Sequence, residues 1–152
     1  MKPIRFCNVP DHIGLSAATS RWPDGSIPYC LYDSIPGVAD QTYLAATKWS
    51  LSEWARYGKL KPYEIQTARM ARILLTSRRI DGPKGVLGET ELPNLNSKFV
   101  RMWLDESENW NLTWPFVSPG ISLWQVDLHE IGHALGIGHA PAGIRAVMSP
   151  YL

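Results

Sequence analysis

The most constraining feature of this sequence is an eleven-residue run from His129 to His139, which holds three of the four histidines of the chain. It has the pattern His-Glu-x-x-His-x-x-Gly-x-x-His. In an α-helix, residues four apart lie on one face about one turn apart, so His129 and His133 point to a common centre. A glycine soon after the second histidine favours the left-handed turn that ends a helix. The run therefore predicts a helix that ends near Gly136 and a turn that brings His139 back to the same centre.

Three imidazoles around one point suit a tetrahedral Zn²⁺, and a set of only three protein ligands leaves a fourth position for water. Glu130 follows the first histidine and points beside the metal, so we expect it to activate the zinc-bound water as general base. The pattern thus favours a zinc-dependent endopeptidase that hydrolyses peptide bonds of proteins. The alternatives are a zinc-stabilised peptide-binding or latent module without turnover, which has no need of Glu130, and a structural protein in which the pattern is coincidental.

Length and composition favour one globular domain and argue against nucleic-acid and membrane partners. A chain of 152 residues can bury its own core. The net charge of +1 gives no reason to expect a nucleic-acid partner. The sequence contains no run of about 18 apolar residues, so a membrane span is not expected. Cys7 and Cys30 are too few for a disulfide framework, and the sequence leaves open one bridge or two free thiols. We expect a monomer that takes a protein or peptide substrate.

The spacing of apolar residues and of turn residues predicts an α+β domain. Helices are expected over residues 39–57 and 120–135, the second of them N-capped by Ser118. The predicted strands cover residues 27–32, 61–66, 70–76, 86–92 and 99–104, whereas residues 1–25 and 109–119 are predicted to be irregular. The expected architecture is a twisted mixed sheet of about five strands with two long helices, the second carrying the histidines.

With this pattern the sequence resembles the metzincin metallopeptidases, in which the long histidine motif is followed by a methionine-containing turn. The string Ala-Val-Met-Ser-Pro around Met148 is similar to the turn of the matrixins (matrix metalloproteinases). Residues 81–87 and 103–110 resemble the matrixin Asp-Gly-Pro-Gly-Gly-x-Leu and His-Phe-Asp-x-x-Glu-x-Trp segments. The resemblance implies a catalytic domain over residues 21–152, Met148 beneath the zinc, and a secreted protein, although the N-terminus lacks the apolar core of an export signal.

The resemblance also implies a calcium site. Its six oxygen donors would be the side chains of Asp81, Asp105 and Glu108 and the backbone carbonyls of Gly82, Lys84 and Val86. The alternative is an acidic surface turn without an ion. The second, structural zinc of matrixins is not expected, because two matching places hold Glu89 and Trp103 and His12 is the only histidine outside the motif.

The N-terminus resembles the matrixin pro-segment. Residues 5–11, Arg-Phe-Cys-Asn-Val-Pro-Asp, are similar to the motif Pro-Arg-Cys-Gly-Val-Pro-Asp, whose cysteine caps the zinc. The resemblance implies that Cys7 is an inhibitory zinc ligand within a pro-segment-like stretch over residues 1–20. Phe6 and Asn8 depart from the motif, and a buried or disulfide-linked Cys7 is the alternative.

Two further expectations concern the substrate. Residues 86–92 are expected to be the edge strand against which an extended peptide lies antiparallel, as the resemblance implies. Matrixin catalytic domains continue into a third helix after the methionine turn, whereas the sequence ends at Leu152. The third helix is therefore expected to be absent, with an open pocket for the side chain that follows the scissile bond.

Overall fold

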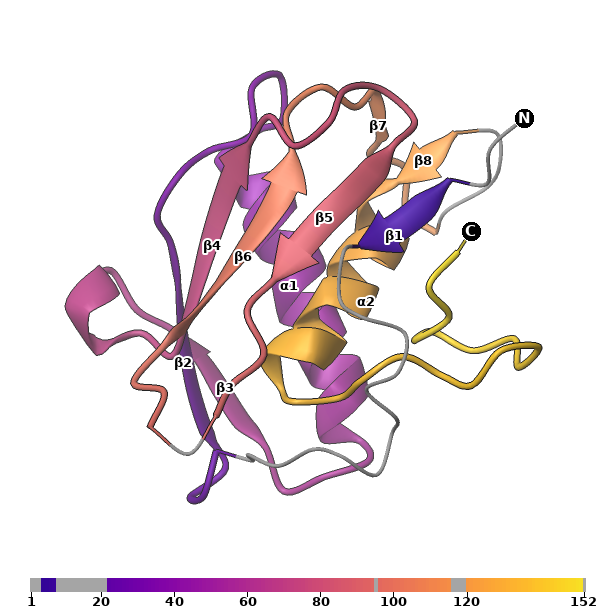
Figure 1. The fold of residues 1–152 in the computed structure, drawn as a ribbon. Coiled ribbons are helices and arrows are strands. Elements are labelled where there is room, and N and C mark those ends of the chain that lie inside the picture. The colour runs from indigo at the N-terminus through magenta and orange to yellow at the C-terminus, as the bar shows by residue number, and fades with distance from the viewer. Residues whose placement is uncertain (1–3, 8–21, 95, 116–119, 152) are drawn as a thin grey trace.

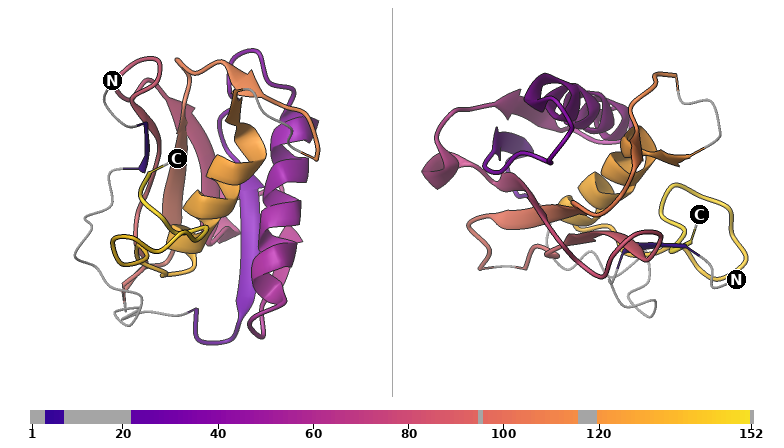
Figure 2. Two further views of the ribbon diagram at one scale, coloured as in Figure 1. Left: turned by 90° about the vertical axis from the view of Figure 1, so that its right-hand side faces the viewer. Right: turned by 90° about the horizontal axis from the view of Figure 1, so that it is seen from above.

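A six-stranded mixed sheet with two helices on one of its faces forms the frame of the protein (Figures 1 and 2). The computed structural model describes residues 4–7, 22–94, 96–115 and 120–151. In chain order the strands of this sheet are β1 Arg5–Cys7, β2 Ser26–Leu31, β3 Lys61–Glu64, β4 Ile73–Arg78, β5 Val86–Thr90 and β6 Val100–Asp105. Their order across the sheet is β1-β5-β6-β4-β2-β3, and β5 and β6 are its antiparallel pair.

The two helices are α1, Asp40–Ala55, and α2, Leu123–Ala134. A short 3-10 helix covers Ala68–Met70, and two-residue strands β7, Trp110–Asn111, and β8, Ile121–Ser122, pair as a second small sheet. The predicted α+β class, with a mixed sheet and two helices, is confirmed. No helix in the described ranges has the length and apolarity that a membrane crossing requires.

The prediction of irregular structure was wrong for β1 and β7, and the large sheet has six strands instead of about five. These strands are three and two residues long, too short for an alternating apolar pattern to appear. Their extended conformation depends on pairing with residues far away in the sequence: β1 pairs with β5, and β7 with β8.

The start of α2 also differs from the prediction. Its N-cap is Ser122, whose hydroxyl accepts a hydrogen bond from the backbone N–H of Gln125 at 3.4 Å. Ser118, the predicted cap, lies outside the described residues. Because Ile121 and Ser122 pair with β7, the chain stays extended up to Ser122 and the helix begins only at Leu123.

The core lies between the sheet and the helices. Leu75 of β4 and Met102 of β6 are paired neighbours without solvent exposure, and Ile131 of α2 is equally buried. Each such side chain contributes about 1.5–3 kcal/mol through its removal from water. This packing fixes the height of α2 above β5 and β6.

Polar contacts set the position of α2 against α1. Trp54 of α1 donates its indole N–H to the carbonyl of Leu128 at 2.9 Å, and Thr47 donates to the buried carboxyl of Asp127 at 2.9 Å. Burial raises the pKa of Asp127 to about 7. Gly132 permits the close approach, because a Cβ there would lie 2.9 Å from the Trp54 ring and 2.4 Å from the sulfur of Met148. The histidine-bearing helix is therefore held on both sides.

Candidate metal centre and active site

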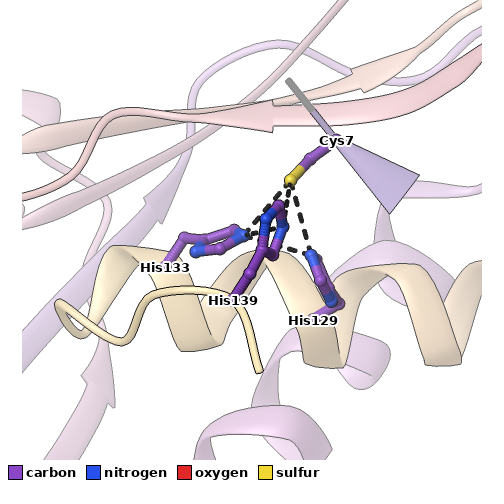
Figure 3. Close-up of side chains that lie close together, drawn as sticks. All are labelled: Cys7, His129, His133 and His139. Carbon is purple, nitrogen blue, oxygen red and sulfur yellow. Dashed lines mark hydrogen bonds between the residues drawn. The ribbon is translucent and has the colours of Figure 1, made fainter. Parts of the chain in front are cut away.

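Four side chains from three parts of the chain converge on one buried point (Figure 3). His129 and His133 project from α2, His139 comes from the segment after the helix, and Cys7 comes from β1. All four are at most 1% exposed. The three predicted zinc-binding histidines are thus brought together, and Cys7 lies among them.

The turn after α2 has the predicted left-handed glycine. Gly136 has a φ of 91°, and its N–H donates to the carbonyl of His133 at 2.8 Å. The next residue, Ile137, donates to the carbonyl of Gly132 at 2.9 Å. These two bonds form a Schellman motif, which satisfies carbonyls at the helix end and reverses the chain. The reversal brings His139 back to the helical histidines.

The ligand atoms are arranged as in a tetrahedral zinc site but lie slightly closer together. The Nε2 atom of His133 lies 3.1 Å from that of His129 and 3.2 Å from that of His139. The Sγ atom of Cys7 lies 3.1–3.4 Å from the three Nε2 atoms. With Zn–N bonds of about 2.0–2.1 Å and a Zn–S bond of about 2.3 Å, a tetrahedral site has ligand separations of about 3.3–3.6 Å.

The protonation of two of the imidazoles suits a cation at this point. His129 and His133 bind the backbone carbonyls of Val147 and Ile137 through Nδ1, at 2.8 and 2.7 Å, so each Nδ1 carries the proton. Burial lowers the pKa of His129 to about 4 and that of His133 to about 2, which keeps both rings neutral. Their Nε2 lone pairs therefore face each other across 3.1 Å. A cation between them would turn this repulsion into attraction.

Glu130, the predicted general base, is fully buried beside the histidines. Its Oε2 accepts a hydrogen bond from the Thr90 hydroxyl of β5 at 2.5 Å, and its Oε1 has no hydrogen-bond partner among the described residues. A Cβ at Gly88 would lie 2.9 Å from the Glu130 carboxyl, so the glycine leaves room for this side chain. Burial raises the pKa of Glu130 to about 8.

Met148 is buried and packs against α2 at Gly132, which lies between His129 and His133 in the sequence. Its backbone carbonyl accepts a hydrogen bond from Ala140 at 2.8 Å, which ties the segment of His139 to the methionine turn. The adjacent carbonyl of Val147 holds His129. The methionine turn thus touches the site through backbone and side chain.

Strand β1 lies beside β5 and brings Cys7 to the histidines. It runs parallel to β5, with Cys7 opposite Gly88, and the N–H of Phe6 donates to the carbonyl of Pro150 at 3.0 Å. The Phe6 ring stacks on the imidazole of His129, with centroids 4.7 Å apart and planes inclined by 13°. The prediction that residues 86–92 form an edge strand was therefore wrong, because β1 lies between β5 and the edge of the sheet. Cys7 forms no disulfide with Cys30.

The residues expected to bind calcium form a loop wrapped around three carboxylates. Asp81 accepts from the N–H of Val86 at 2.9 Å, and Glu108 from the N–H of Lys84 at 2.6 Å. The carboxylate of Asp105 accepts from the N–H of Asp81 at 3.3 Å. Burial, with a further contribution from Asp105 and Asp81, raises the pKa of Glu108. Within the described ranges, a tight group of three or more metal-ligand side chains occurs at Cys7 and the three histidines, and this loop is not such a group.

Glu89 and Trp103 stand at two positions that match ligands of the second matrixin zinc, and both contact an arginine. Glu89 and Trp103 are paired neighbours on β5 and β6. Arg78 of β4 forms an ion pair with Glu89, and its guanidinium lies 4.4 Å from the centre of the Trp103 ring. An ion pair and a cation–π contact therefore join three strands on this side of the sheet.

Two residues at the site had no signal in the sequence. Thr90 and Gly88 contact Glu130, yet neither belongs to a metal or catalytic motif. Gly88 and Thr90 are two positions apart, which puts them on one face of β5. The sequence does not say that this face lies over α2, so the contact emerges only from the packing.

Comparison with known proteins identifies the lineage of the chain. The family model described as matrixin matches residues 21–152. Matrix metalloproteinase-19 of Homo sapiens is 29% identical over 139 residues, 86% of this chain and 26% of the relative. Metalloendoproteinase 1 of Glycine max is 30% identical over 142 residues, 86% of this chain and 45% of the relative. Stromelysin-3 of Rattus norvegicus is 35% identical over 168 residues, 99% of this chain and 33% of the relative. The chain thus spans less than half the length of these relatives.

Proposed function

Because this chain belongs to the matrixin family, we propose that it is a zinc-dependent metalloendopeptidase that hydrolyses peptide bonds of proteins. The observation that carries the proposal is the convergence of three buried imidazoles with the carboxylate of Glu130 beside them. A structural zinc site has no need of that carboxylate.

The Nε2 atoms of His129, His133 and His139 would hold the ion. A zinc ion bound there supplies Lewis acidity, which polarises the scissile carbonyl and lowers the pKa of a water molecule. Glu130 accepts a proton from the attacking water and passes it to the leaving amine. Burial raises the pKa of Glu130, and a nearby cation lowers it again, so the carboxylate can act as a base near neutral pH.

The substrate would bind as an extended strand in the place that β1 occupies in this structure. Two backbone partners support this proposal: β5 on one side of β1, and Pro150 on the other. A peptide that replaced β1 would add to the sheet through the same main-chain groups of β5. We expect it to run antiparallel to β5, opposite to the direction of β1.

Cys7 is proposed to hold the enzyme in a latent state. A thiolate in the fourth position of the zinc site displaces the water that hydrolysis needs. The stacking of Phe6 on His129 and the bond from Phe6 to Pro150 hold the thiol in place. The same closed set of four ligands also favours the second candidate, a zinc-stabilised module without turnover, because structural zinc sites are closed.

Replacement of Glu130 tests the peptidase directly. In a Cys7→Ala background, Glu130→Ala should lower the rate of cleavage of an unstructured protein by about 100-fold or more, since general-base catalysis contributes about 10²–10⁴-fold. Zinc content, measured in the same samples, should stay unchanged, and a chelator should abolish cleavage. Cleavage that survives either Glu130→Ala or the chelator would contradict the mechanism.

Replacement of Cys7 tests latency and separates the two candidates. Cys7→Ala should raise the cleavage rate of the full chain by at least about tenfold, because it reopens the fourth ligand position. Cys30→Ala is the matched control: Cys30 is also a buried thiol, but it packs against Ala71 and Leu74 away from the histidines. Equal rates for Cys7→Ala and Cys30→Ala would refute latency. A Cys7→Ala chain that binds zinc and cleaves nothing would favour the module without turnover.

Calcium is proposed to bind the loop of Asp81, Asp105 and Glu108, because the backbone of the loop wraps around these three carboxylates and carboxylate oxygens are ligands that Ca²⁺ prefers. Millimolar Ca²⁺ should raise the midpoint of thermal unfolding, with a stabilisation of about 2.7 kcal/mol at 100 times the Kd. This rise should disappear in Asp105→Ala and persist in Asp33→Ala, which removes an exposed carboxylate. The same rise in both variants would argue against this site.

A further inference from the structure

One hydrogen bond at the site is not explained by metal binding or by the closure of β1. The hydroxyl of Thr90 lies 2.5 Å from Oε2 of Glu130, and the two residues are 40 positions apart in the sequence. Both side chains are buried. The carboxylate oxygen can only accept here, so Thr90 donates its proton to the bond while the carboxylate is ionised.

The bond leaves the two oxygens of Glu130 in different environments. Oε2 is occupied by Thr90, whereas Oε1 is buried without a hydrogen-bond partner among the described residues. Oε1 also lies against Gly88, where the missing side chain leaves space. A buried carboxylate oxygen without a donor is costly and is rarely kept unless something else binds it.

We propose that Thr90 is a positioning residue for the general base, an inference that rests on the proposed function. By donating to Oε2, Thr90 fixes the carboxylate plane and leaves Oε1 to accept the proton of the attacking water. That proton passes from Oε1 to the leaving amine, and Thr90 keeps its own proton throughout. The β-branched side chain suits this task, because its χ1 angle is restricted in a strand.

Kinetics of three variants in the Cys7→Ala background test this role. Thr90→Val keeps the shape and removes the donor, and it should lower kcat by about 10- to 100-fold with KM little changed, as expected for a misplaced catalytic group. Thr90→Ser restores a donor and should recover most of kcat. Thr76→Val is the matched control: Thr76 is equally buried and donates to the carbonyl of Met102 at 2.9 Å, but it lies on β4. It should leave kcat unchanged.

A second readout does not depend on turnover. Thermal unfolding of the full chain, at matched zinc content, is measured for Thr90→Val, Glu130→Ala and the double variant. If the hydrogen bond exists, Thr90→Val lowers the unfolding midpoint more in the presence of Glu130 than in Glu130→Ala. Thr76→Val should lower it equally in both backgrounds.

The outcomes separate this inference from the proposed function. An active Cys7→Ala chain with an unchanged kcat in Thr90→Val, or with additive unfolding shifts, would overturn the role of Thr90 and leave the peptidase intact. A Cys7→Ala chain without cleavage would overturn the peptidase and the base-positioning role together, even if the unfolding shifts were coupled.

Discussion

The structure depends on an electrostatic constraint at one buried point. Neutral imidazoles whose outer nitrogens are bonded to backbone carbonyls must direct their lone pairs inward, and at His129 and His133 those lone pairs are 3.1 Å apart. Without a cation this arrangement is repulsive. Two elements, the Schellman turn at Gly136 and the methionine turn, supply the chain reversal and the carbonyls that enforce it. The backbone around the site thus favours a cation there.

The same buried point also receives the N-terminal strand β1, which places Cys7 against the histidines. Cys7 adds a fourth donor to the three histidines, and the main chain of β1 pairs with the side of β5 that the proposed peptide would use, in the opposite direction. The contact of Phe6 with His129 is a stacking interaction at a position where the matrixin pro-segment has arginine. In this chain, closure therefore relies on aromatic packing and on the thiol. The proposed latent state and the proposed substrate site therefore share one surface.

The sequence was most informative where a motif carries its own geometry. The positions of the histidines, the helix that bears them and the left-handed glycine all follow from local spacing, and the structure places them together. Local spacing says nothing about which distant residues pair, and the misses have this origin. The conformation of β1, the late start of α2 at Ser122 and the bond from Thr90 to Glu130 each depend on a partner more than ten residues away. The resemblance to matrixins indicates a role for Cys7 as a zinc ligand, but it indicates no role for Thr90.

The most direct test of the central claim is X-ray absorption at the zinc edge on the full chain, loaded with one equivalent of zinc. We expect the zinc to be surrounded by three nitrogens at about 2.0–2.1 Å and one sulfur at about 2.3 Å. The sulfur should be replaced by a lighter oxygen or nitrogen donor in Cys7→Ala, while the three nitrogens remain. A wild-type first shell with fewer than three imidazole nitrogens, or one without sulfur, would contradict the convergence of Cys7 and the three histidines on a single metal ion.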